Sequence, residues 1–252
     1  MIVDVHQHLG KDDIYDIEYT EDELISKADD AGIEKMIVQP ACTQFIEKAK
    51  KMHDQIAQVA QSHPGRVYGM ASVNPHYGRE LYVNEIKRCI QELNFIGIKL
   101  HTMAHACFPN SNNGRMVFET AAEFNVPVMV HTGKGLPFSK PLNILLPAKE
   151  FSQVPIIVAH AGALFFYQEA LILAKECPNV FLETAVPHHN SRTIKKYITA
   201  LGSRRIMMGS GSPDEMQHMI WKIRDDPQTK LKSQDVMWCL GKTAIDVFKL
   251  PI

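Results

Sequence analysis

The sequence MIVDVHQHLG, residues 1–10, joins an apolar run to two histidines, and it decides how the rest of the chain is interpreted. Side chains alternate between the two faces of a β-strand, so we expect His6 and His8 on one face, with Asp4 beside them. Two imidazoles roughly 6–7 Å apart along a strand can bind one metal ion. The pair alone is a weak signal, because a strand can end in two polar residues that have no function.

Seven further short apolar segments are predicted as strands, and helical patterns separate them. They cover residues 35–40, 67–73, 95–101, 126–131, 154–160, 180–184 and 205–209. Apolar strands that alternate with helices indicate a parallel sheet covered by helices. Eight such units in 252 residues predict an α/β fold, the (β/α)8 TIM barrel, as one domain over residues 1–252. The alternative is an open doubly wound sheet, but no glycine-rich phosphate loop follows the first strand.

Composition and charge narrow the class of protein. The net charge of −1 gives no electrostatic reason to expect a nucleic-acid partner or an anionic membrane partner. The five cysteines are scattered and form no C-x-x-C motif, which is typical of reduced thiols. We find neither a signal-peptide pattern nor an apolar run of transmembrane length. We therefore expect a cytoplasmic protein with a small-molecule substrate, and the sequence is compatible with a homo-oligomer.

Polar residues gather at the predicted strand ends, which form the active-site face of a barrel of this kind. These residues are His6, His8, Lys99, His101, His131, His160 and Glu183. A single histidine after a strand is usually a hydrogen-bonded rim residue, but four strands that end in histidine at one face indicate a metal or catalytic centre.

Neutral imidazole suits zinc and neighbouring metals, and three ligands with one open position make a catalytic site. His6, His8 and His131 can supply three nitrogens, and His160 is either a further ligand or the group that handles the proton of a bound water. Lys99 and His101 share a face, and we expect them to contact an anionic group of the substrate.

The chain resembles the amidohydrolase superfamily, and most closely its amidohydrolase-related branch of metal-dependent barrel hydrolases and decarboxylases. The resemblance rests on the segments DVHQH, GIKLH, PVMVHTG, IIVAHAG and LGKTAIDVF, and it spans nearly the whole chain. It implies a divalent metal, usually zinc, with His6, His8 and His131 as ligands and His160 as a ligand or water-orienting residue. In some members a modified lysine on the fourth strand bridges two metals, and a plain lysine that meets the substrate is the other interpretation of Lys99.

One position departs from the family pattern after the eighth strand. The family has glycine, a small residue, aspartate, one more residue and proline, and this chain has Gly209-Ser-Gly-Ser-Pro213. Gly211 therefore stands where the aspartate that binds metal and takes the proton of the water would be. Asp214 and Glu215 could substitute for it, but the stretch Ser212–Glu215 is also typical of a helix start.

These observations predict a hydrolase that uses a metal to activate water against a C–N or C–O bond of a small, anionic substrate. A decarboxylase would use the same metal scaffold and differ in its substrate. A third hypothesis, based on Gly211, is a barrel that has lost turnover and binds a ligand.

Overall fold

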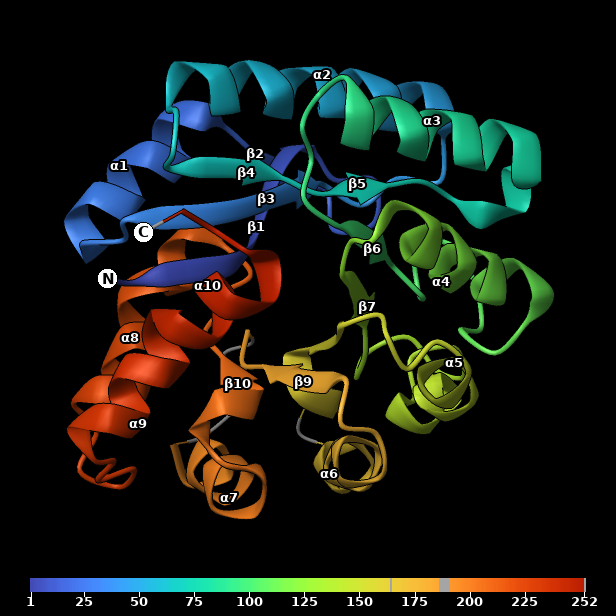
Figure 1. Ribbon diagram of the computed structural model, residues 1–252. Helices are drawn as coiled ribbons and strands as arrows, with labels where there is room; N and C mark the ends of the chain where they lie inside the picture. Colours follow the sequence, from blue (N-terminus) through green and yellow to red (C-terminus); the bar gives the residue numbers. More distant parts are fainter. Residues whose placement is uncertain (164, 186–190, 252) are drawn as a thin grey trace.

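The chain folds into a ring of parallel strands enclosed by helices, and a computed structural model describes residues 1–163, 165–185 and 191–251 (Figure 1). The strands are β1 Val3–Lys11, β2 Glu18–Tyr19, β3 Lys35–Pro40, β4 Val67–Gly69, β5 Ala71–Ser72, β6 Ile98–Leu100, β7 Val128–His131, β8 Ile156–Ala159, β9 Val180–Glu183 and β10 Ile206–Met207. The α-helices are α1 Glu21–Ala31, α2 Ile46–Ser62, α3 Arg79–Gln91, α4 Asn112–Phe124, α5 Leu145–Glu150, α6 Tyr167–Glu176, α7 Ser191–Leu201, α8 Met216–Arg224, α9 Ser233–Met237 and α10 Thr243–Phe248.

The strands form a barrel because their order closes on itself. One sheet has the order β2-β1-β3-β4 and the other the order β10-β9-β8-β7-β6-β5. β4 and β5 are two halves of one barrel strand, since β4 pairs with β3 and β5 pairs with β6. The first and last strands meet where Val5 N donates to Met208 O at 3.2 Å and Gly211 N donates to His6 O at 2.8 Å. The predicted (β/α)8 barrel is therefore confirmed, and the short β2 is an antiparallel addition to β1.

The first helix shows how local sequence sets the element boundaries. Thr20 is the N-cap of α1, and its side chain accepts a hydrogen bond from Glu23 N at 3.3 Å. Gly32 ends the helix in the left-handed conformation, with φ of 68°, which glycine adopts without strain. Within the described ranges, no helix is long and apolar enough to cross a membrane.

A β-bulge in β1 sets which side chains reach the barrel interior. Asp4 pairs with Met36 and Gln7 pairs with Val38, so β1 has one residue more than β3 between these pairs. The bulge lets both Val5 and His6 face inward, although simple alternation would place them on opposite faces.

The sequence pattern predicted that Asp4 would share the face of His6 and His8, and this prediction is wrong. The buried Asp4 carboxylate accepts hydrogen bonds from Ser210 N at 3.1 Å and Gln7 Nε2 at 2.9 Å. Because Ser210 follows β10, Asp4 helps to hold the last strand of the barrel against the first.

The barrel interior is apolar below the ends of the strands. Val5, Ile37, Met129, Ile157 and Met207 form an inner cluster one layer deeper than the strand-end histidines. A second, larger cluster fills the space between the strands and the surrounding helices. This apolar floor leaves the carboxyl ends of the strands as the place where polar side chains gather inside the barrel.

A buried polar network joins the helices α2 and α3 to β5. His53 donates from Nδ1 to Glu85 at 2.7 Å, and its Nε2 accepts a hydrogen bond from Ser72 N at 3.0 Å. Arg88 donates twice to the same carboxylate, at 2.9 and 2.8 Å. Both imidazole nitrogens are thus engaged within the protein, so this cluster of His53, Glu85 and Cys89 holds the helices together and offers no free ligand atom to a metal.

We expect the Glu85→Gln variant to lower the free energy of unfolding by about 2–3 kcal/mol at pH 7. Burial alone would raise the pKa of Glu85, but the hydrogen bonds from His53 and Arg88 outweigh burial and lower the pKa to about 2. This stabilisation is complete above the unfolded pKa of 4.5 and is lost as the pH falls towards 2. Urea unfolding measures the free energy of unfolding of the variant and of the unmodified protein. The difference between these two free energies should become smaller below about pH 4.5.

The matched control is Glu123→Gln, because Glu123 is exposed on α4. That change should alter the free energy of unfolding by less than about 0.5 kcal/mol. A Glu85→Gln effect as small as that of the control would show that the network contributes nothing to stability.

Candidate metal centre

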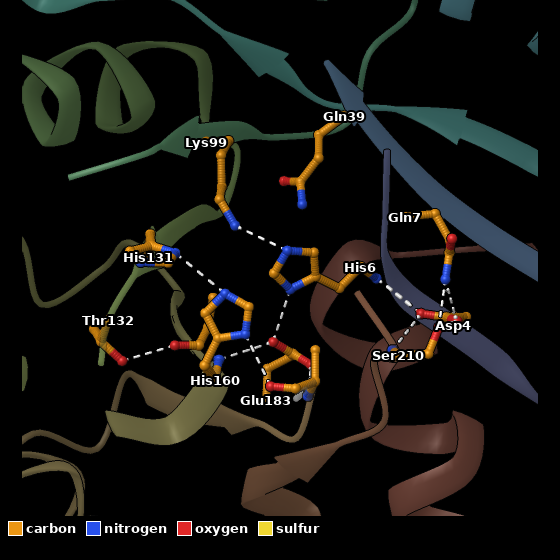
Figure 2. A network of polar contacts seen from close by, with 12 residues as sticks. Asp4, His6, Gln7, Gln39, Lys99, His131, Thr132, His160, Glu183 and Ser210 are labelled. Carbon is orange, nitrogen blue, oxygen red and sulfur yellow. Dashed lines mark hydrogen bonds and ion pairs between the residues drawn. The ribbon is translucent and has the colours of Figure 1, made fainter. Parts of the chain in front are cut away.

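The barrel brings together the histidines that lie far apart in the sequence. β1 carries His6 and His8, β7 ends in His131, and His160 directly follows β8. The ring centroids of His6 lie 5.2 Å from His8 and 4.8 Å from His160, and His131 and His160 are also 4.8 Å apart. Figure 2 shows the His6, His131 and His160 side chains converging on one another from different strands.

Each of the four imidazoles is anchored through one ring nitrogen. The partner is in every case a carbonyl or carboxylate oxygen, which can only accept, so the anchored nitrogen carries the hydrogen. The bonds are His6 Nδ1 to Glu183 Oε2 at 2.9 Å, His8 Nδ1 to Pro40 O at 3.1 Å, His160 Nδ1 to Ala185 O at 2.8 Å and His131 Nε2 to Lys134 O at 3.0 Å. The other nitrogen of each ring therefore presents a lone pair.

The lone pairs of His131 and His160 face each other, which suits a cation, while the lone pair of His6 meets the Lys99 ammonium. His160 Nε2 lies 3.1 Å from His131 Nδ1, and in these tautomers neither nitrogen has a hydrogen to share with the other. A cation between two such lone pairs would replace a repulsion with two bonds. Four neutral imidazole nitrogens are a donor set for zinc and neighbouring divalent ions, so these residues fit the metal that the sequence predicts.

Burial keeps these imidazoles neutral at physiological pH. Together with the nearby Lys99 ammonium, it lowers the pKa of His8 to about 4 and that of His131 to about 3. The pKa of His6 falls well below its ordinary value of 6.5 for the same two reasons. Because metals bind the neutral ring, the site does not have to release protons before it binds an ion at pH 7.

His101 has a different role from the other four. Its Nδ1 accepts a hydrogen bond from Ala104 N at 3.1 Å, so the ring hydrogen lies on Nε2. The ring stacks on His131, with centroids 4.2 Å apart and an angle of 17° between the planes. His101 therefore presents an N–H group to a bound molecule and offers no lone pair to a metal.

Lys99 and Glu183 are buried on opposite sides of the His6 ring, Lys99 at Nε2 and Glu183 at Nδ1. The Lys99 Nζ lies 3.3 Å from His6 Nε2, and both the lysine and the glutamate are almost fully buried. Burial lowers the pKa of Lys99 and raises the pKa of Glu183. The structure thus places Lys99 against His6 and outside the lining of the cavity, where the sequence pattern had predicted that it would meet the substrate.

The Glu183 carboxylate is the outer partner that orients the centre. Besides His6, it accepts hydrogen bonds from His160 N at 3.0 Å and from Ala185 N. Gly209 makes room for it, because a Cβ at that position would collide with the carboxylate. Sequence analysis noted Glu183 as a strand-end residue, but the pattern carried no sign of which histidine it would hold.

The turn that carries His160 has a strained backbone. His160, Ala161 and Ala163 have φ angles of 62°, 41° and 48°, in the left-handed region that non-glycine residues avoid. Surrounding hydrogen bonds hold the turn, including Tyr197 Oη to Ala161 O at 2.9 Å and Gly162 N to Thr132 Oγ1 at 2.9 Å. Such strain is typical of functional sites, where it fixes the direction of a side chain.

Among the residues that the structure describes, neither Asp214 nor Glu215 substitutes for the missing side chain at Gly211. Asp214 is exposed and pairs with Lys27 of α1 at 2.7 Å, and Glu215 pairs with His218 at 3.1 Å. Ser212 and Pro213 begin the short helical turn before α8, so the interpretation of this stretch as a helix start is confirmed. A Cβ on Gly211 would meet only the Cβ of Ala185, at 3.4 Å, so the space for a side chain is open.

A cavity of about 130 Å³ lies over the histidines. Its lining includes His8, His101, His131, His160 and Gly211, and also residues that sequence analysis missed, namely Asp12, Tyr15, Tyr19, Cys42, Thr132, Lys134 and Ala163. Most of the missed residues lie in loops, where no periodicity shows which side chains turn towards the strand ends.

Comparison with known proteins was made for both sequence and structure. The amidohydrolase family model matches residues 3–250. No curated protein matches the chain.

Several solved structures share the fold over 99% of this chain. A dihydroxybenzoic acid decarboxylase from a Polaromonas species, with bound manganese and the inhibitor 2-nitroresorcinol, has a TM-score of 0.78 at 18% identity, with 97% of its chain covered. A 5-carboxyvanillate decarboxylase from Novosphingobium aromaticivorans, complexed with manganese and a nitrobenzoic acid, has a TM-score of 0.78 at 17% identity, with 96% covered. An uncharacterized TIM-barrel protein from Bordetella bronchiseptica has a TM-score of 0.79 at 15% identity, with 98% covered.

We expect the Glu183→Gln variant to bind Mn²⁺ or Zn²⁺ about 10- to 100-fold more weakly than the unmodified protein, because outer-shell carboxylates tune ligand histidines by this amount. Competition with a chelating dye measures the affinity. His218→Gln is the control, since His218 is an exposed histidine on α8 and its loss should leave the affinity unchanged. Equal affinities for the Glu183→Gln variant and the unmodified protein would show that this carboxylate does not support the metal.

Proposed function

The chain belongs to the amidohydrolase family, and on this premise we propose that it is a divalent-metal-dependent decarboxylase of a small carboxylate. His6, His8, His131 and His160 hold the metal in this proposal. A divalent ion there acts as a Lewis acid on the oxygen atoms of the substrate. Two of the similar structures contain manganese, so manganese stands beside zinc as the metal to be tested.

The observation that carries the proposal is a cavity rich in nitrogen groups and without a free carboxylate. Asp12 is the acidic side chain among the described residues that line the cavity. Its carboxylate accepts hydrogen bonds from three backbone N–H groups, those of Ile14 at 2.7 Å, Tyr15 at 2.8 Å and Cys42 at 3.0 Å. Asp12 therefore holds loops in place and is poorly suited to act as a base.

The lack of a free carboxylate bears differently on hydrolysis and on decarboxylation. Hydrolysis needs a base that takes a proton from the attacking water, and Gly211 cannot provide one. Decarboxylation breaks a C–C bond, leaves the electron pair on the substrate carbon and requires a proton to be delivered to that carbon. A site whose described lining offers hydrogen-bond donors and no free carboxylate base suits decarboxylation better than hydrolysis.

Lys99 and His101 attract and bind the substrate in this proposal. Lys99 lies behind the cavity lining and contacts His6, so we assign to it the positive charge that draws the carboxylate group of the substrate towards the histidines. The proton that replaces carbon dioxide on the substrate carbon enters from solvent through the cavity in this proposal. We assign to the Nε2–H group of His101, which lines the cavity, the binding of an anionic oxygen of the substrate.

We expect the manganese-loaded protein to release carbon dioxide from members of a panel of hydroxybenzoates and related small carboxylates. Replacing His131 with alanine removes a ligand nitrogen and should lower the rate at least about 100-fold, whereas His218→Ala should leave it unchanged. A coupled bicarbonate assay measures the release. Metal-dependent hydrolysis of esters, amides or lactones without carbon dioxide release would contradict the proposal and favour the hydrolase.

A barrel without turnover is the second candidate, and Gly211 is the observation that favours it. We expect Gly211→Asp to raise metal affinity by about 10-fold and to increase hydrolysis of an ester and lactone panel, because it adds a charged ligand and a base. Gly211 has φ of 81°, and aspartate and asparagine tolerate that region better than other residues. Gly211→Asn is therefore the matched control without the charge.

The outcome of this comparison is read from the difference between the two variants. If Gly211→Asp and Gly211→Asn have the same metal affinity and the same hydrolytic rate, the missing carboxylate does not limit the chemistry of the site. Carbon dioxide release by the unmodified protein would count against the barrel without turnover.

A further inference from the structure

A second and larger cavity adjoins the one over the histidines. It has a volume of about 740 Å³ and is lined by residues 133–136 after β7 and by Ala163, Phe165 and Phe166 after β8. Lys134 and Ala163 line both cavities, so the two spaces meet at these residues. We call the larger space the apolar annex.

The loops that bound the annex approach each other through glycine. Gly133 and Gly135 have φ angles of 100° and 94°, which exclude most other residues. A Cβ on Gly133 would lie 2.6 Å from the Cβ of Ala163, and a Cβ on Gly135 would run into the Met103 side chain. The two glycines are therefore closely packed against Ala163 and Met103. A larger residue at either position would collide with these side chains.

The rest of the lining is apolar and open to solvent. Phe165 is 84% exposed and Leu136 is 59% exposed, although both are large hydrophobic side chains. Exposed apolar groups that cluster beside a cavity are typical of a ligand-binding surface. The annex thus suits a ligand part that covers Phe165 and Leu136 without needing hydrogen bonds.

The junction between the cavities has the opposite character. Lys134 is exposed there, and within the described part of the chain no carboxylate forms an ion pair with it. A carboxylate that enters between the annex and the histidines passes this ammonium group, which attracts it. The positive charge of Lys134 therefore lies between the polar cavity over the histidines and the apolar annex.

We infer that the substrate is an amphiphilic carboxylate, whose carboxylate end lies among the histidines and whose apolar extension fills the annex between Leu136 and Phe165. The inference rests on the proposed function for the reacting end, and the annex adds the substrate class. A single-ring carboxylate would fill only the smaller cavity of about 130 Å³ and leave the annex empty.

The test is the binding of a series of carboxylates by isothermal titration calorimetry to the manganese-loaded protein. The series is benzoate, 3-phenylpropanoate, 5-phenylpentanoate and 8-phenyloctanoate. Because burial of each methylene group favours binding, affinity should rise by up to about fourfold per added methylene while the extension lies in the annex. Leu136→Gln and Phe165→Gln should each lower the affinity for 8-phenyloctanoate at least about fivefold and leave the affinity for benzoate unchanged.

The control is Trp221→Gln, since Trp221 is a large exposed side chain on α8, away from the annex. Melting curves should show that all three variants fold, because each residue is exposed. An affinity that does not rise with length, or a rise that both annex variants retain, overturns the inference. Failure of the proposed function would appear in a different measurement, as the absence of carbon dioxide release. The binding role of the annex would still be supported if affinity rises with ligand length and this rise is lost in Leu136→Gln and Phe165→Gln.

Discussion

The buried carboxylate of Glu183 is the constraint on which the arrangement of the centre depends. A charge in the barrel interior is stable only when hydrogen-bond donors surround it, and Glu183 takes its donors from β9, from β1 through His6 and from the turn of His160. It fixes the tautomer of His6, so the other nitrogen of that ring, Nε2, faces the Lys99 ammonium. Gly209, beside β10, leaves the space that the carboxylate occupies. Segments from three strands are thus placed around one negative charge.

The strained turn after β8 connects the Glu183 carboxylate with the two cavities at the surface of the barrel. His160 has a left-handed backbone because Glu183 and the hydrogen bonds to Ala161 and Gly162 hold it there. The same turn ends at Ala163, which lines both the cavity over the histidines and the apolar annex. The direction of a ligand histidine and the shape of the substrate cavity are therefore set by one short segment, and a change in it would affect both.

The sequence predicted the barrel and the meeting of its histidines, because apolar strands of regular spacing and polar strand ends are local signals. The predicted position of Asp4, on the face of His6 and His8, was wrong because the bulge in β1 changes the alternation of side chains, and one sequence contains no sign of an extra residue. The position of Lys99 behind His6 depends on side-chain packing across the barrel, which spacing along the chain does not describe. The annex was missed for a different reason, since it lies beside two loops that meet at Gly133 and Ala163, and no pattern along the chain indicates that contact.

The charges of the centre bear on the class of substrate. The buried imidazoles are neutral, so a bound divalent ion and Lys99 would bring three positive charges into a space whose nearby carboxylates are those of Glu183 and Asp12. An aspartate in place of Gly211 would offset part of this excess, as in the family pattern. Without it, the excess positive charge in a low-dielectric site favours an anionic ligand over a neutral one. In the proposed reaction, a carboxylate substrate would supply the negative charge that the missing side chain lacks, whereas a neutral ester or amide would leave the positive charge uncompensated.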